Sequence, residues 1–299
     1  MKAALLSPDY RVLHEERRPT GREAGPAEVV ERVLSFAADL RTRGRDLFGE
    51  EPAACGVGVP GVLDEEAGVA VFAANLGWRD VPLRRLLRER LEDRVPVALA
   101  HDVRLGGLAE GRLGAGKDAD RFFFVSLGTG IAGAIGVGGR VDPGAHGGSG
   151  EVGHVVVRPD GPECGCGGRG CLETLASASA VGRAWREASG RPEADAADCA
   201  RAVAAGDERA EAVWRTAVGD LASGLMTAVT LIDPAVLIVG GGLAEAGDTL
   251  LDPLREAVAE RITFQTAPRI VPAALGEAAG CLGAGVRAWD LLDAHVRTS

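Results

Sequence analysis

The chain of 299 residues lacks the segments that mark membrane and secreted proteins. No run of eighteen uncharged apolar residues occurs, so no membrane-spanning helix is predicted. The first residues show no charged region followed by an apolar one, so no secretory signal is predicted either. Low-complexity segments and short repeats are also absent. We therefore expect a soluble, cytoplasmic protein with no membrane partner.

The chain also has fewer basic residues than acidic ones. The chain carries 33 Lys and Arg against 43 Asp and Glu, giving a formal net charge of -10, and no basic tail offsets it. A negative overall field repels the phosphates of nucleic acids. This balance argues against a nucleic-acid partner.

Hydrophobic residues make up 46% of the chain, which is enough for a large core in one or two domains. Strand-like and helix-like apolar patterns alternate along the sequence, which is typical of α/β architecture. We predict two α/β halves flanking a cleft. The first comprises residues 1–102 and is completed by a C-terminal helix over 282–299; the second comprises residues 103–281.

The individual elements are predicted from apolar periodicity and from the turns between the periodic segments. Strands are expected over residues 2–7, 11–17, 54–59, 69–73, 95–100, 122–127, 133–137, 236–239 and 270–272. Helices are expected over residues 26–45, 81–93, 103–113, 243–262 and 277–295, with a mainly helical region over 175–232.

The segment from His154 to Glu173 gathers a histidine and three cysteines in a short, glycine-rich loop. With His154, the thiols of Cys164, Cys166 and Cys171 form a set of four N/S ligands, which zinc favours in closed structural sites. The intervening glycines supply backbone flexible enough to bend three sulfurs around one ion. A disulfide pair with a spare thiol, or three unrelated cysteines, are the alternatives.

Asp102 follows the apolar strand VPVALA at the start of a predicted helix. In open α/β sheets, functional groups lie at this end of a strand. A single carboxylate there can accept the proton of a hydroxyl that attacks phosphorus. The structural alternative is a helix N-cap, a common role for Asp.

Two glycine-rich turns follow predicted strands. In the first, Gly128, Thr129 and Gly130 could bring backbone amides and a hydroxyl close to phosphate oxygens, although a plain hairpin turn has the same composition. In the second, Gly240, Gly241 and Gly242 stand between a strand and a helix, where a nucleotide could lie against the backbone. A third candidate, the segment 111–117, is rejected because Asp follows its Lys where a phosphate loop needs Ser or Thr.

Asn75 lies in the polar turn AANLGW near the predicted cleft edge of the first half. Its amide could bind a hydroxyl of a polyol. An Asn in such a place also commonly closes a turn.

These motifs together resemble those of the ROK family of sugar kinases and sugar-responsive repressors. The resemblance covers nearly the whole chain and is most specific in the block of His154 and CGCGGRGCLE. It implies a fold of two actin-like ATPase (ribonuclease H-like) domains that close on a sugar and ATP, as in hexokinases. It also implies an ATP- and Mg²⁺-dependent hexose kinase that phosphorylates the 6-hydroxyl of glucose or a related aldohexose. The resemblance further implies a homodimer or homotetramer with structural Zn²⁺.

The resemblance assigns roles to residues of this sequence. Asp102 would be the catalytic base. The residues that would bind the sugar are Asn75, His101, Glu151, His154 and Glu173. His154 would also hold zinc with Cys164, Cys166 and Cys171, while Gly128, Thr129 and Gly130 would receive the ATP phosphates and Gly240, Gly241 and Gly242 the adenosine.

The chain departs from the family pattern at two places. His101 stands where the family usually has Asn, which changes one sugar contact. The family's Asp-x-Gly-Gly-Thr phosphate turn would precede Lys2, upstream of the sequence as given. A sugar-binding or sugar-sensing protein without kinase activity is therefore the alternative function. A DNA-binding regulator is disfavoured by the acidic charge.

Overall fold

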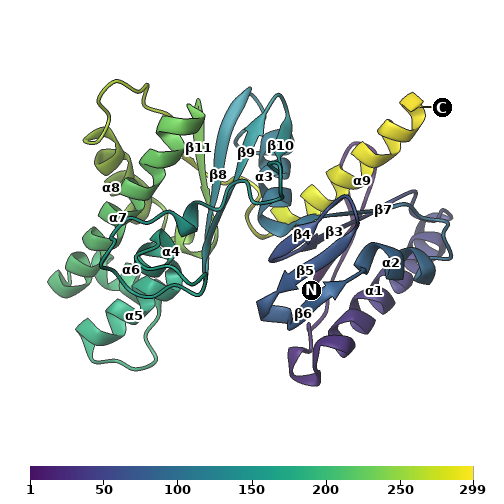
Figure 1. The fold of residues 1–299 in the computed structure, drawn as a ribbon, viewed down its shortest axis with the longest axis horizontal. Coiled ribbons are helices and arrows are strands. Elements are labelled where there is room, and N and C mark those ends of the chain that lie inside the picture. Colours follow the sequence, from purple (N-terminus) through teal and green to yellow (C-terminus); the bar gives the residue numbers. More distant parts are fainter. Residues whose placement is uncertain (299) are drawn as a thin grey trace. The chain divides into compact units, whose positions relative to one another are not determined.

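The computed structural model of the protein describes residues 1–298 (Figure 1). It divides into two compact units. Unit 1 comprises Met1–Ala109, Pro143–Gly148 and the C-terminal segment from Ala278, and unit 2 comprises Glu110–Asp142 and Ser149–Glu277. Within residues 1–298, no helix combines the length and the apolar character needed to cross a membrane.

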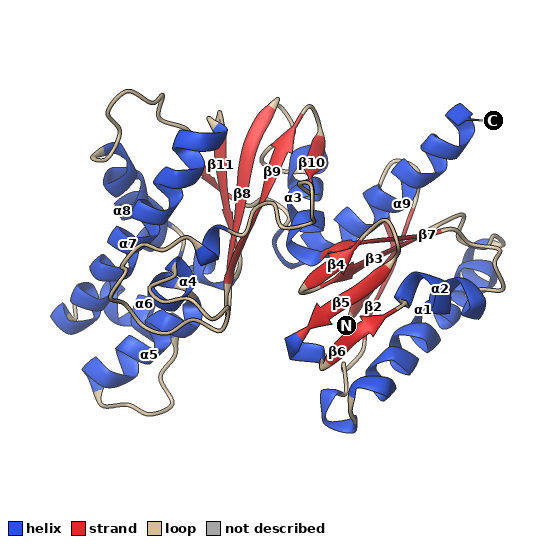
Figure 2. Cartoon of the chain, in the orientation of Figure 1, coloured by secondary structure: helices blue, strands red, loops and turns tan. Residues whose placement is uncertain are grey.

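Unit 1 contains three small sheets (Figure 2). Its strands are β1 (Lys2–Leu6) with β2 (Val12–Arg17), the parallel pair β3 (Cys55–Val59) and β7 (Val97–His101), and the antiparallel set β4 (Val62–Asp64), β5 (Val69–Ala73) and β6 (Trp78–Val81). Its helices are α1 (Pro26–Phe48), α2 (Leu83–Arg90) and α9 (Ala279–Thr298).

The helices of unit 1 have clear local causes. Pro26 opens α1, where its fixed φ suits a helix start, and Gly49 ends it in the left-handed conformation with φ 75°. Glycine also sets how closely α9 approaches β3, because a Cβ at Gly56 would collide with the carbonyl of Ala284. Apolar side chains of α1, α2 and the strands then form one buried core that includes Leu34, Leu87 and Leu99.

Unit 2 is built on a five-stranded sheet of order β10-β9-β8-β11-β12. The strands are β8 (Arg121–Leu127), β9 (Ile131–Val137), β10 (Arg140–Asp142), β11 (Val236–Gly240) and β12 (Arg269–Pro272), with β8, β11 and β12 parallel. The helices are α4 (Leu172–Ala176), α5 (Ala178–Ser189), α6 (Ala196–Ala204), α7 (Glu208–Ile232) and α8 (Asp248–Ala259).

The main core of unit 2 lies between one face of this sheet and the helices α4 to α8. It contains Phe123 and Val239 from the sheet and Trp185, Leu221 and Leu254 from the helices. The long helix α7 is capped by the Asp207 side chain, which accepts a hydrogen bond from the amide of Arg209. Burial of this apolar face stabilises the sheet whose strand ends carry the candidate site.

Helix α3 (Asp102–Leu113) crosses the boundary between the units, which falls between Ala109 and Glu110. From the sequence, we predicted that this boundary follows Asp102. The helix continues because its later residues pack on the sheet of unit 2, where a Cβ at Gly111 would collide with the ring of Phe122. A second difference is the segment 143–148, which belongs to unit 1 although both of its flanks belong to unit 2.

Several predicted elements need correction. The short strands β4, β6 and β10 were not predicted, because three or four residues carry too little periodicity. The predicted helix over 243–262 is two elements, a 3-10 turn over Gly242–Ala246 and then α8. Gly247 separates them with φ 59°, a conformation that ends a regular helix. Similarly, α2 begins only after Pro82, and Val81 belongs to β6.

Candidate functional site

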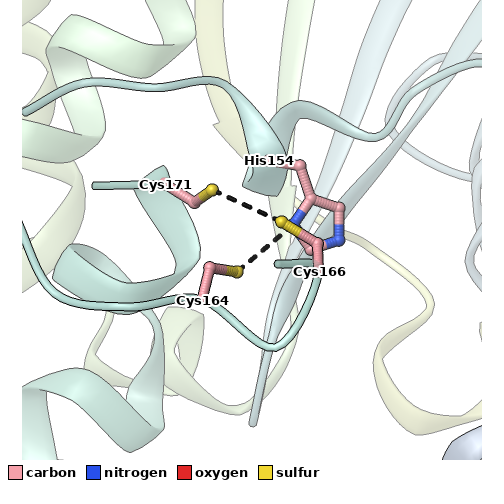
Figure 3. Close-up of side chains that lie close together, drawn as sticks. All are labelled: His154, Cys164, Cys166 and Cys171. Atoms are coloured by element: carbon pink, nitrogen blue, oxygen red, sulfur yellow. Dashed lines mark hydrogen bonds between the residues drawn. The ribbon is translucent and has the colours of Figure 1, made fainter. Parts of the chain in front are cut away.

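Four potential metal ligands come together in unit 2. The ligand atoms of His154, Cys164, Cys166 and Cys171 all lie within 4.8 Å of one another. Figure 3 shows the four side chains pointing toward a common centre. The His154 Nδ1 atom lies 3.7 Å from Cys164 Sγ, and Cys166 Sγ lies 3.7 Å from Cys171 Sγ.

These distances fit a tetrahedral zinc ion. Zn–S bonds of about 2.3 Å and Zn–N bonds of about 2.0 Å place neighbouring ligands of a tetrahedron roughly 3.5–3.8 Å apart. The two distances of 3.7 Å match this range, and the donor set of three sulfurs and one nitrogen is one that zinc favours. Four protein ligands complete the shell, so the set suits a structural ion and leaves no position for a reactive water.

The backbone of the loop depends on its glycines. Gly170 has φ 67°, and a Cβ there would collide with the carbonyl oxygen of Arg158. A Cβ at Gly168 would stand 3.5 Å from Cys166 Sγ and 3.6 Å from Cys171 Sγ, so the chain passes directly beside the sulfurs. Any larger residue at Gly170 would therefore displace the loop.

The thiols differ in their acidity. Burial raises the pKa of Cys171 to about 12, whereas hydrogen bonding, chiefly from the Gly168 backbone, lowers the pKa of Cys166. The buried thiol is thus protonated at neutral pH in the metal-free loop, and an incoming metal ion must displace that proton.

An ion pair that the sequence did not reveal anchors the loop. Arg158 Nε donates to Asp220 Oδ1 of α7 at 2.8 Å, and Asp220 is only 6% exposed. Burial raises the pKa of the Asp220 carboxyl, and the Arg158 guanidinium opposes part of that effect. The backbone of Arg158 also forms hydrogen bonds within the loop, because its amide donates to the carbonyl of Gly170 and its carbonyl accepts from the amide of Gly161.

Glu151 and His154 lie just before the loop, on either end of a single 3-10 turn. Both are partly exposed, and Glu151 Oε2 lies 3.9 Å from His154 Nε2. The turn packs closely on β9, since a Cβ at Gly153 would collide with the carbonyl of Ile131. The second imidazole nitrogen of His154 therefore lies on the side of the Glu151 carboxylate, while the first faces Cys164.

Glu173 lies at the other end of the loop and contacts the first glycine turn. Its Oε2 accepts a hydrogen bond of 2.9 Å from the amide of Ile131. A Cβ at Gly130 would collide with the same carboxylate. The predicted sugar-binding carboxylate and the predicted phosphate-binding turn are thus neighbours in unit 2.

The two glycine turns lie at adjacent strand ends. β8 and β11 pair in parallel with Ser126 opposite Gly240, so the residues that follow each strand share one edge of the sheet. Gly241, with φ 86°, packs on the backbone of Leu127. The amide of Gly128 donates to the carbonyl of Gly130, so within the described residues this amide serves the hairpin turn.

Asp102 lies in unit 1, at the carboxyl end of β7. Its side chain is 47% exposed, with Oδ1 3.6 Å from His101 Nδ1. The same oxygen accepts from the adjacent Val103 amide, whereas an N-cap bonds to an amide one or two residues further along. Gly58 on the neighbouring strand packs against the first turn of α3, since a Cβ there would stand 3.0 Å from Leu105 Cδ1 and 3.6 Å from the Asp102 Cβ.

Asn75 also lies in unit 1, exposed in the 3-10 turn Ala74–Leu76 that follows β5. Gly61, just after the end of β3, packs against Phe72 and Ala73 at the end of β5. The Asn75 turn therefore lies near the carboxyl end of β3, the strand that pairs with β7. His101 is 7% exposed as the last residue of β7.

One further buried acid was not predicted. Glu110 of α3 is fully buried and accepts hydrogen bonds from the amides of Ala115, Ala274 and Leu275. It fixes the turn that follows β12. No local pattern in the sequence distinguishes it from an ordinary helix glutamate.

Parallel strands with glycine turns at their carboxyl ends, and an acid at the end of a buried strand, are the arrangement by which open α/β folds present functional groups. The model of the ROK family matches residues 1–289. The chain belongs to the ROK family. It therefore has the family's sugar-kinase fold, which is of the actin-like ATPase type.

Comparison with individual proteins agrees with this assignment. The chain is 36% identical to a glucokinase of Thermotoga maritima over 296 residues, covering 94% of this chain and 91% of the relative. The crystal structure of a ROK hexokinase from Thermus thermophilus matches with a TM-score of 0.85 at 35% identity. The match covers 98% of this chain and 100% of the hexokinase chain. A ROK glucokinase from Streptomyces griseus, solved with glucose and AMPPNP, has a TM-score of 0.82 at 28% identity, with coverages of 96% and 95%.

Proposed function

We propose that the protein is an ATP-dependent hexose kinase that phosphorylates the 6-hydroxyl of glucose or a closely related aldohexose. The observation that carries this proposal is the contact of Glu173 with Gly130 and Ile131. It joins the candidate hexose site to the candidate phosphate turn within one unit. The glucokinase and hexokinase relatives support the same reaction class.

Asp102 is the proposed catalytic base. Phosphoryl transfer needs a carboxylate that orients the attacking hydroxyl and accepts its proton as the bond to phosphorus forms. The Asp102 carboxylate is half exposed at a strand end, so it is accessible to a bound sugar.

Each unit carries side chains that we assign to hydroxyl contacts with the hexose. In unit 2 these are Glu151, His154 and Glu173, which lie at the two ends of the segment 154–173, called the metal loop below. In unit 1 they are Asn75 and His101. A mixture of carboxylates, imidazoles and an amide supplies both acceptors and donors for sugar hydroxyls.

ATP would bind with Mg²⁺ at the shared strand edge of unit 2. Gly128, Thr129 and Gly130 would receive the phosphates, and Gly240, Gly241 and Gly242 would lie against the adenosine. Gly242 supports this role because no atom lies within 4 Å of the position of an added Cβ, so its backbone is open. Fixed amides and dipoles in such turns stabilise the charge of a transferring phosphoryl group.

Zinc would be structural, held by His154, Cys164, Cys166 and Cys171. When bound, it would fix the loop that joins Glu151 to Glu173 and so set the separation of these two carboxylates. A cytoplasmic location and a homodimeric or homotetrameric assembly remain predictions from the sequence.

A coupled assay for ADP release tests the proposal. It would be run with the purified chain, ATP, Mg²⁺ and, separately, glucose, mannose, N-acetylglucosamine, N-acetylmannosamine, fructose and allose. We expect ADP release that depends on an aldohexose and is lost in Asp102→Asn. Hexose binding by calorimetry without any sugar-dependent ADP release would contradict kinase activity and favour a sugar-sensing role.

A further inference from the structure

The segment Pro143–Gly148, called the strap below, packs in unit 1 although the residues on both sides of it belong to unit 2. The strap begins just after β10 and ends three residues before Glu151. Most of its residues are exposed. A segment with so few buried side chains needs polar or backbone contacts to remain in place.

Arg104 supplies such a contact. It lies in the first turn of α3, two residues after Asp102, and is only 4% exposed. Its Nη1 donates to the carbonyl oxygen of Gly147 at 2.8 Å, and its Nη2 donates to Glu65 Oε1 at 3.0 Å. The buried guanidinium is thus shared between a carboxylate and the backbone of the strap.

The strap is also shaped to fit at that point. Gly147 has φ 72°, which favours glycine, and a Cβ there would stand 3.1 Å from the carbonyl oxygen of Leu63. The next residue, Gly148, has an ordinary φ and no atom within 4 Å of a Cβ position. The strap therefore packs closely against the backbone of Leu63 at Gly147 and has open space at Gly148.

The hydrogen bond at Gly147 limits how far the residues that follow it can move. Four residues of chain span at most about 14 Å, so the distance from Gly147 to Glu151 is bounded by the backbone alone. Holding Gly147 removes conformational freedom from the residues before Glu151 and His154. A sugar that binds these side chains then has less disorder to remove.

We propose that Arg104 is a positioning residue of the hexose site: it fastens the strap to the helix that begins with Asp102 and so preorganises the segment that carries Glu151 and His154. The inference rests on the proposed hexose-binding role of those two residues. Arg104 has no contact with the reacting groups in this role and acts through Gly147.

Two matched pairs of variants test the proposal. Arg104→Met removes the anchor, and Arg84→Met is its control, because Arg84 donates to the backbone carbonyls of Glu65 and Glu66 and so steadies the same turn without contacting the strap. Gly147→Ala disturbs the strap without changing Arg104, and Gly148→Ala adds the same methyl group in open space.

Hydrogen exchange and hexose calorimetry supply the readouts. In Arg104→Met and Gly147→Ala, we expect amides of residues 143–154 to exchange about tenfold faster and the Kd for glucose to rise about tenfold, the size of effect expected for one lost hydrogen bond to a charged group. Zinc content should stay at the unmodified level. Arg84→Met and Gly148→Ala should change neither the exchange of residues 149–154 nor the Kd by more than about twofold.

The outcomes separate this inference from the proposed function. Unchanged exchange at residues 149–154 in both Arg104→Met and Gly147→Ala would overturn the inference, whatever the sugar result. Equal effects of Arg104→Met and Arg84→Met would also overturn it, because the turn at Glu65 would then be the cause. Failure of the unmodified chain to bind any hexose would instead refute the proposed function. If Arg104→Met does not fold, the Gly147 and Gly148 pair decides alone.

Discussion

The carboxylate of Glu173 accepts a hydrogen bond from the backbone amide of Ile131, with 2.9 Å between Oε2 and the nitrogen. Glu173 follows the last cysteine of the metal loop by two residues, and Ile131 is the first residue of β9. The bond therefore ties the end of the loop to the end of the Gly128–Gly130 turn. It makes the geometry of one candidate site depend on the other.

This bond predicts different effects for two substitutions at one position. Glu173→Gln keeps an oxygen that can accept from Ile131, while Glu173→Ala removes it. We expect both to raise the KM for the hexose, but only Glu173→Ala to raise the KM for ATP, by about tenfold. Steady-state kinetics with each substrate varied in turn would measure this. Equal KM values for ATP in the two variants would show that the turn does not depend on Glu173.

The folded chain should bind one zinc ion per molecule. Cys166→Ala removes one ligand of the tetrahedral shell and should release the metal. Cys199 lies in the core of unit 2, so Cys199→Ala should leave the zinc content unchanged. Elemental analysis of protein purified without chelator measures the ratio. Absence of metal from the unmodified protein would refute the assignment.

Zinc binding should strengthen as pH rises. The pKa of Cys171, raised to about 12 by burial, means that this thiol is protonated in the metal-free loop at neutral pH. Zinc requires the thiolate, so binding releases protons and its apparent affinity falls as pH is lowered. Competition with a chelator of known affinity between about pH 6 and pH 8 would measure the slope. An affinity that does not change with pH would contradict the displaced proton.

The ion pair of Arg158 and Asp220 should control how long the loop retains zinc. Asp220→Asn keeps the shape of the side chain but removes the negative charge that pairs with Arg158. We therefore expect release of zinc to a chelator to be about tenfold faster. Glu163→Gln is the control, because its ion pair with Arg169 lies on the exposed side of the same loop. An equal rate in Asp220→Asn and the unmodified protein would show that the metal alone holds the loop.

Asp102→Asn should keep sugar affinity within about tenfold while lowering kcat by at least about 100-fold, since shape is kept and basicity is lost. Calorimetry and the ADP assay measure the two quantities separately. If kcat survived in Asp102→Asn but was lost in Glu151→Gln, the base would be Glu151.

A side chain at position 56 should disrupt the packing of α9 on β3. Gly56→Ala would force a methyl group into the carbonyl of Ala284, so we expect a loss of about 1–3 kcal/mol in the free energy of unfolding. Gly280→Ala, on the same helix with open space around it, should be neutral or stabilise by about 0.5–1 kcal/mol. Urea unfolding curves would compare them, and equal stability of the two variants would contradict the close approach.

Short-range features were predictable because their causes are adjacent in the chain. Pro26 and Gly49 bracket α1, apolar runs specify β7, β8 and β11, and the cysteines of the metal loop lie close enough in sequence to be recognised as a set. The clustering of the one histidine with the three cysteines and the strand-end position of Asp102 were therefore predictable from the sequence.

The tertiary structure alone decided the contacts between distant segments. Glu173 and Ile131 are 42 residues apart, Arg104 and Gly147 are 43 apart, and Arg158 and Asp220 are 62 apart. Hydrogen bonds of this kind leave no periodicity, because each partner occupies an ordinary position in its own element. The sequence determined the elements and the donor set of the metal loop through local propensity and spacing, whereas the anchors of that loop and of the strap arise only when packing brings those elements together.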